Sequence, residues 1–514
     1  MAAPIIVPAL GGALLLMLHS APLSTARIVS AAATAAFVAA SIALFAGASS
    51  DEVLVYALGG WPAPFGIVLV ADRLSALMVL LTALLAAAVL TYATQGWDAR
   101  GRFFHALFQF QLMGLAGAFL TGDLFNLFVF FEVLLIASYC LMLQGLGRER
   151  LRATLHYVAI NLSASGVFLI AVSLLYGVTG TLNMAHLAER VAGLPAQDVA
   201  LARAAGLLLI GVFCVKAALF PLYFWLPAAY SHAAAPVATL FAIMTKVGVY
   251  AIIRVTTLIF GADAGAAADL ASPWLLPLAL ATLALGALGA LGAQRLATMS
   301  AYLTIASVGT MLAAVSAGAA AGLSAALYYL AHSTLAIAML FVISDLLGRS
   351  RGEQGDALRE GPPLRHAAAL GLAFLFAGAT VAGVPPSTGF LGKLLVLGSV
   401  RDSAAAALIW AVVLVSSFLM LMSCVRAGSL VLWKVGDPLP RASATASGPG
   451  RPGEWCALAG LMACSAALIV FAGPAKDYAD AAAAQLASPE RYVRAVLGHA
   501  RGDLVRPLPA AAPR

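Results

Sequence analysis

Apolar runs of about twenty residues, the length that crosses a bilayer as a helix, recur along this chain of 514 residues from its start to about position 472. Hydrophobic residues make up 62% of the sequence and charged residues only 10%. Inside a bilayer every backbone N–H and C=O needs an internal partner, which only helices and closed barrels provide. The runs lack strict alternation of apolar and polar residues, so they predict helices. We therefore expect an all-α polytopic membrane protein.

The breaks between the runs predict about fourteen helices, centred near residues 13, 38, 80, 111, 133, 165, 214, 243, 282, 307, 335, 378, 415 and 463. The first run follows no basic segment and precedes no convincing small-residue cleavage site, so we expect a first helix and not a removed signal peptide.

Most loop arginines follow odd-numbered helices, for example in the stretches 148–152 and 349–359, while the even-numbered loops hold far fewer. By the positive-inside rule the loops that follow odd-numbered helices are cytoplasmic, and both termini then face the periplasm of a bacterial inner membrane. The basic tail after Gly473 disagrees with this topology. The positive-inside rule gives most weight to short segments near helix ends, so we base the predicted topology on the loops and not on the tail.

Prolines interrupt two of the expected helices. The seventh runs into Phe-Pro-Leu-Tyr-Phe-Trp-Leu-Pro at 220–227, and the twelfth contains Gly-Val-Pro-Pro-Ser-Thr-Gly at 383–389. Broken backbone at membrane depth survives only against protein or a water-filled cavity, and paired broken helices point to a transporter site. Each break falls in the fourth helix of a group of five. This spacing predicts two inverted five-helix repeats with broken helices 7 and 12.

The expected organisation has six parts. They are three N-terminal helices in residues 1–100, a first five-helix unit in 101–258, a second unit in 270–434, a flexible loop in 435–454, the fourteenth helix in 455–473, and a C-terminal tail in 474–514 that is disordered from 506. The five cysteines show neither CxxC pairs nor Cys/His metal spacing, and no phosphate-binding motif occurs. We expect no metal and no cofactor.

Lysine is rare in this chain, and three of its five lysines, Lys216, Lys246 and Lys393, lie inside apolar runs. A guanidinium stays protonated in proteins, whereas a desolvated ammonium group can release its proton. Side chains that reach back to the membrane surface are the alternative, which suits Lys216 and Lys246 poorly because both are near mid-helix. The lysines therefore predict a proton-handling protein.

Glu132 is the only glutamate within a predicted helix, and an ionisable residue there costs about 2.5 to 3.5 kcal/mol. It is a functional candidate, with a structural ion pair as the alternative. His332, in the eleventh helix, could pass protons near neutral pH or only form hydrogen bonds. His232 and Tyr250 are candidates for an access path, with solvation and helix packing as the alternatives. Asp123, nine residues before Glu132, is expected to cap a helix or to act as an interfacial anchor, and not to join the relay.

These residues resemble the antiporter-like family shared by respiratory NADH:quinone oxidoreductase, membrane-bound hydrogenases and Mrp-type multisubunit antiporters. The stretches that look like the D-type subunits of Mrp antiporters are Thr-Gly-Asp-Leu-Phe-Asn-Leu-Phe-Val-Phe-Phe-Glu-Val at 121–133, Lys-Ala-Ala-Leu-Phe-Pro at 216–221, Thr-Lys-Val-Gly-Val-Tyr at 245–250, His-Ser-Thr at 332–334 and the tail at 488–498.

The resemblance implies a proton relay. Glu132 and Lys216 would form an interacting charge pair, Lys246 the relay centre, His332 a link, and Lys393 the terminal proton site. Quinone-reductase relatives commonly have His and Asp at the positions of Tyr223 and Ala228, which favours an antiporter over a respiratory complex.

The expected function is a subunit of a monovalent cation (Na⁺ or K⁺)/proton antiporter, a secondary transporter and not an enzyme. The resemblance implies other subunits of a hetero-oligomeric membrane complex as partners. The net charge of +7 is spread over loops, so we expect no nucleic acid. The alternatives are a proton-pumping membrane subunit of an NADH:quinone oxidoreductase or hydrogenase, and a scaffold that does not transport.

Overall fold

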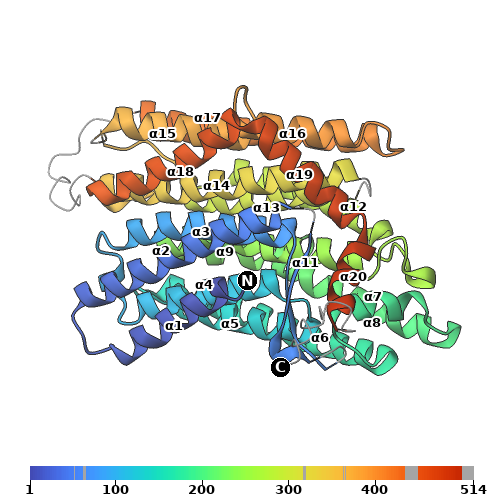
Figure 1. Cartoon of the computed structure of the whole chain (residues 1–514). Helices are drawn as coiled ribbons and strands as arrows, with labels where there is room; N and C mark the ends of the chain where they lie inside the picture. The colour runs from blue at the N-terminus through green and yellow to red at the C-terminus, as the bar shows by residue number, and fades with distance from the viewer. Residues whose placement is uncertain are drawn as a thin grey trace.

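The computed structural model describes residues 1–50, 52–61, 65–316, 320–362, 364, 366–434 and 450–500, and its long helices run side by side (Figure 1). Of the flexible loop expected at 435–454, residues 435–449 lie outside this description. The segment expected to be disordered, 506–514, lies outside it entirely.

Among the residues that the structure describes, fourteen helices or helix pairs correspond to membrane crossings and follow one another in chain order. The N-terminal three are α1 (Ala3–Met17), α2 (Leu23–Ala48) and α3 (Arg73–Ala93). The next five are α4 (Phe104–Leu120), α5 (Leu124–Met142), α6 (Arg148–Thr179), the pair α8 (Ala196–Ala217) and α9 (Trp225–His232), and the pair α10 (Ala235–Phe241) and α11 (Met244–Leu258). The last six are α12 (Ser272–Gly292), α13 (Leu296–Val315), α14 (Ala320–Ser350), the pair α15 (Ala367–Ala382) and α16 (Thr388–Ser399), α17 (Ala406–Gly428) and α18 (Pro452–Val470).

Length and composition support these crossings. Within the described part of the chain, eleven helical segments are long and apolar enough to cross a membrane, and α1, α4, α15 and α16 are shorter apolar helices. When α15 and α16 are counted as one crossing, the described part of the chain has fourteen crossings, as the sequence predicts. The prediction of an all-α polytopic membrane protein is confirmed.

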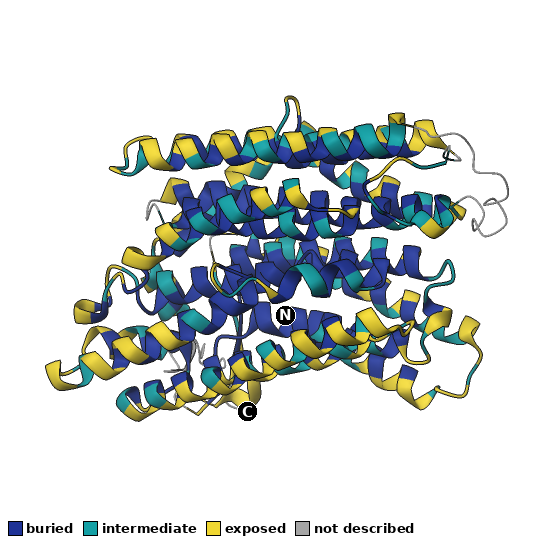
Figure 2. Ribbon diagram, turned by 180° about the vertical axis from the view of Figure 1, so that it is seen from behind, coloured by how far each residue is buried: buried dark blue, intermediate teal, exposed yellow. Residues whose placement is uncertain are grey.

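Burial divides the helices into an inner and an outer set. The most apolar segments of α10–α11, α13 and α14 are almost wholly buried, whereas about two thirds of the corresponding segments of α2, α17 and α18 are not. Figure 2 shows buried residues filling the middle of the bundle and exposed ones on the outer helices. The outer faces are apolar because lipid, not water, would surround them.

Both breaks occur where the prolines predict them. α8 ends at Ala217, and Ala218 takes a left-handed conformation with φ of 58°. α15 ends at Ala382, followed by Gly383 with φ of 80°, a conformation that favours glycine. Ser387 then caps α16 by accepting a hydrogen bond from the backbone N–H of Phe390 at 3.3 Å.

One end of the bundle carries structure that the sequence analysis did not predict. It consists of an antiparallel pair of strands, β1 (Leu54–Ala57) and β2 (Val68–Ala71), and the helices α7 (Met184–Ala192), α19 (Ala472–Leu486) and α20 (Pro489–Ala500). α20 packs against α7, and α19 crosses α14 (Figure 1). The segment expected only as a tail therefore begins with two helices that pack on the bundle.

Candidate functional site

The three lysines of the apolar runs are buried inside the protein. Lys216, Lys246 and Lys393 expose 8%, 0% and 6% of their surface, which excludes side chains that reach the membrane surface. His332 is also buried. Glu132 is only partly buried. Four of the five predicted relay residues thus lie where water is scarce and where a charge needs a partner.

Residues of α6 lie between Glu132 of α5 and Lys216 of α8. The hydroxyl of Ser165 donates a hydrogen bond to the Glu132 carboxylate, and the Lys216 ammonium donates to the backbone carbonyl of Asn161 at 3.4 Å and to its side-chain Oδ1 at 3.3 Å. The two charges interact electrostatically, but no salt bridge joins them in the described part of the chain. The expected charge pair is bridged and not in direct contact.

Sequence reasoning missed Asn161 and Ser165. Their spacing of four residues on α6 places them on one helix face, and a polar pair with this spacing in an apolar helix was the available signal. The Nδ2 of Asn161 donates to the carbonyl of Tyr157 at 3.0 Å, which directs Oδ1 toward Lys216.

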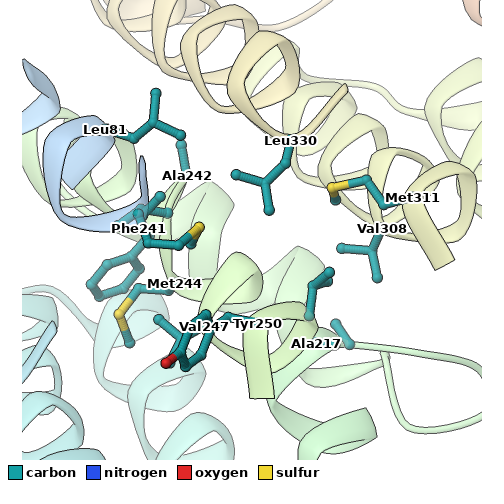
Figure 3. Packing of buried hydrophobic residues seen from close by; sticks show 14 of the residues in the cluster. Leu81, Ala217, Phe241, Ala242, Met244, Val247, Tyr250, Val308, Met311 and Leu330 are labelled. Carbon is teal, nitrogen blue, oxygen red and sulfur yellow. The ribbon is translucent and has the colours of Figure 1, made fainter. Parts of the chain in front are cut away.

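Lys246 occupies the centre of the inner helices. Its ammonium lies 3.4 Å from Ser307 Oγ of α13. Its neighbours in sequence, Met244 and Val247, belong to a buried apolar cluster to which α3, α10, α13 and α14 also contribute (Figure 3). α11 also packs tightly on the end of α8, because a Cβ added to Gly248 would lie 2.4 Å from the backbone nitrogen of Ala217. This contact brings the helix of Lys246 against the residue that follows Lys216.

His332 of α14 contacts the start of α16. Its Nδ1 forms a hydrogen bond of 2.9 Å with Thr388 Oγ1, the first residue of α16 after the break. Both Lys246 and Lys393 lie within electrostatic reach of its ring. Gly389 permits this approach, since a Cβ there would come within 2.9 Å of the His332 ring and 1.8 Å of the Thr380 carbonyl.

Lys393 binds the broken end of α15. Its ammonium donates hydrogen bonds to the carbonyls of Ala382 at 2.7 Å and Val381 at 3.3 Å. The last carbonyls of a helix lack partners within the helix and carry a partial negative charge. The break therefore creates the acceptor that a buried ammonium needs.

The two access-path candidates have different surroundings. His232 lines a cavity of about 770 Å³ at the end of the bundle formed by the odd-numbered loops, and the hydroxyl of Tyr230, buried and without a hydrogen-bond partner among the described residues, also lines it. Tyr250 lies one turn beyond Lys246, with its hydroxyl donating to the carbonyl of Phe119 at 2.7 Å.

A second buried charge pair lies further along the same helix. Arg254 of α11 donates to both carboxylate oxygens of Asp72, at 2.6 and 2.8 Å, and Asp72 caps α3. Sequence reasoning missed this pair because the partners are far apart in sequence. Asp123 caps α5, as expected. Among the described residues no group of three or more His, Cys, Asp or Glu side chains could hold a metal ion.

The chain is similar to known proteins over most of its length. Residues 121–422 match the family described as NADH:quinone oxidoreductase/Mrp antiporter, transmembrane. The chain is 40% identical, over 87% of both chains, to the D-type subunit of a probable K⁺/H⁺ antiporter of Rhizobium meliloti. It is 36% identical to the D-type subunit of the Na⁺/H⁺ antiporter of Bacillus subtilis, over 96% of this chain and 98% of that one. A chain of the Mrp complex of a Dietzia species has a TM-score of 0.83 at 29% identity, with 97% of this chain and 99% of that chain covered.

Proposed function

The chain belongs to the NADH:quinone oxidoreductase/Mrp antiporter transmembrane family, and on that premise we propose that it is the D-type subunit of a multisubunit monovalent cation/proton antiporter. One observation carries the proposal. Five membrane helices, α5, α8, α11, α14 and α16, each bring one ionisable group into the bundle, four of these groups are buried, and two of them lie beside a helix break.

The proposed relay moves protons between these groups. A buried lysine that gains a proton becomes a charge in a medium of low dielectric constant and repels the next cation. Electrostatic coupling joins Glu132 to Lys216 and joins His332 to both Lys246 and Lys393. The membrane potential supplies about 2.3 kcal/mol for each elementary charge that moves across 100 mV. This energy is enough to bias such a sequence of protonation states.

We also propose the orientation and the setting. Odd-numbered loops face the cytoplasm of a bacterial inner membrane, so the cavity beside His232 opens to the cytoplasm and α19 and α20 lie on the other side. The partners are other subunits of the antiporter complex, and the chain acts as a secondary transporter. Relatives are named for both K⁺ and Na⁺, so either ion can be the cargo of the complex.

Everted membrane vesicles that contain the whole complex test this function. Addition of Na⁺ or K⁺ should collapse an imposed pH gradient, and Glu132→Ala and Lys216→Ala should abolish the collapse. Lys434→Ala is the control, because Lys434 is exposed in a loop. Full activity in both relay variants would contradict the proposal. Proton pumping driven by NADH without added cation would instead assign the chain to a redox complex.

A further inference from the structure

The geometry points to Asn161 and Ser165 of α6 as positioning residues that transmit the charge state of Glu132 to Lys216. This inference rests on the proposed proton relay and deepens it. Both residues are buried, with 1% and 5% of their surfaces exposed, and they supply the hydrogen bonds that connect the two charges. The bridge is defined as the side chains of Asn161 and Ser165 together with the Asn161 carbonyl.

Ser165 has one hydroxyl proton and two acceptors for it. One acceptor is the Glu132 carboxylate, and the other is the Asn161 carbonyl at 3.0 Å. A hydroxyl can donate to only one acceptor at a time, and donation to an ionised group is about twice as strong as donation to a neutral one. The proton of Ser165 therefore turns toward Glu132 when Glu132 is charged and toward Asn161 when Glu132 is neutral.

The Asn161 carbonyl is also an acceptor for Lys216. Within α6 this carbonyl also accepts the backbone N–H of Ser165, which leaves one lone pair. When the Ser165 hydroxyl donates to Glu132, that lone pair accepts from the Lys216 ammonium, which has a second bond to Oδ1 of Asn161. When Ser165 turns to the carbonyl, it competes with Lys216 for that oxygen. A charged Glu132 thus holds the Lys216 ammonium in place, and a neutral Glu132 loosens it.

Helix packing alone does not account for the bridge. Ser163, on the same helix, is exposed and donates only to the carbonyl of Ala159 at 2.8 Å, which is the usual role of a serine inside a helix. Ser165 reaches a second helix in addition to its own backbone carbonyl. Asn161 contacts α8 with both of its oxygens, and an apolar side chain would fill that space without the cost of burying an amide.

Transport by the whole complex in vesicles tests the bridge. We expect Ser165→Ala and Asn161→Leu to lower the cation-dependent rate roughly tenfold or more, because each loses a hydrogen bond to a charged group. Ser163→Ala, the matched control on the same helix, should keep the wild-type rate. Ser165→Thr keeps the hydroxyl and should stay within about twofold. Asn161→Asp should fold and also transport slowly, because a carboxylate beside Lys216 holds its ammonium.

Infrared difference spectra provide a measurement that a purely structural role would not change. The carboxyl band of Glu132, assigned by its loss in Glu132→Gln, should shift in Ser165→Ala and remain in place in Ser163→Ala. An unshifted band, or wild-type transport by both Ser165→Ala and Asn161→Leu, would overturn the bridge. Normal transport by Glu132→Ala and Lys216→Ala is a different outcome and would contradict the proposed function itself.

Discussion

The ammonium group of Lys393, on α16, lies 2.7 Å from the carbonyl oxygen of Ala382, the last residue of α15. The two residues belong to one interrupted helix, so the break places a donor of its second half against an acceptor of its first half. The φ of 80° at Gly383 favours glycine at the break, and a Cβ there would also lie 2.9 Å from the Lys393 side chain. A movement of one half relative to the other would change how firmly the proton on Lys393 is held.

Replacing Lys246 by arginine should stop transport. A guanidinium does not release its proton in a protein, so the central relay position would stay charged. We expect Lys246→Arg to assemble in the complex and to lose at least about nine tenths of cation-dependent proton flux in vesicles. Lys434→Arg, at an exposed loop position, is the control and should transport normally. Full flux in Lys246→Arg would show that reversible lysine charge is not needed there.

Gly389→Ala should damage the link between His332 and α16. The added Cβ would lie 1.8 Å from the Thr380 carbonyl, so the start of α16 must move, at a cost of about 1 to 3 kcal/mol. We expect a lower midpoint of thermal unfolding in detergent and slow transport. Gly398→Ala is the matched control on the same helix, because a Cβ there meets no atom within 4 Å. Equal behaviour of the two variants would argue against the close packing.

A double-mutant cycle should show strong coupling between Asp72 and Arg254. Their side chains expose only 3% and 4% of their surface, so loss of one partner leaves a buried charge unpaired. We expect Asp72→Asn and Arg254→Gln each to lower stability by about 3 to 5 kcal/mol, and the double variant to recover much of that loss. Thermal unfolding of the purified chain measures the stability of the wild type, of each single variant and of the double variant. Additive losses would mean that the pair is not coupled.

The pH dependence of stability should show a contribution from Asp98, in the short helix Asp98–Arg100 between α3 and α4. Burial raises the pKa of its carboxyl, but hydrogen bonds from His105 and Arg27 outweigh burial and lower the pKa from 3.8 to about 2. The stabilisation is therefore complete above about pH 4 and is lost as the pH falls toward 2.

Asp98→Asn tests this dependence. The variant should unfold at a lower temperature than wild type by a constant margin between about pH 5 and 8, with a loss of about 1 to 3 kcal/mol. The margin should narrow only below about pH 4. A margin that vanished well above pH 4 would show that the Asp98 carboxylate is not its cause.

Much of the fold could be predicted because bilayer physics constrains it locally. Run length identified the crossings, and the prolines at 221 and 385–386 identified both breaks, since each feature acts within a few residues of chain. The strands β1 and β2 and the helices α7, α19 and α20 could not be predicted in this way. They are short or only weakly apolar and depend on distant partners, as when the Tyr478 hydroxyl donates to the Arg73 carbonyl at 2.9 Å.

The candidate site was predictable where a single residue breaks an apolar pattern. Lys216, Lys246 and Lys393 are conspicuous because charge is costly at mid-helix. Asn161 and Thr388 were missed because neutral polar side chains are common in membrane helices as packing residues. Their importance depends on which side chains the fold brings to them, and one sequence contains no record of such contacts. The bridge between Glu132 and Lys216 stays a proposal until transport is measured.

The interposed α6 residues have an energetic consequence for turnover. A contact ion pair in an apolar interior is costly to separate, because both charges lose their partner while water is absent. Among the described residues Glu132 and Lys216 form no such contact pair, and a hydroxyl and an amide stand between them. In the proposed relay, a reset would therefore involve rotation of the Ser165 hydroxyl and the exchange of one acceptor, in place of the separation of a contact ion pair.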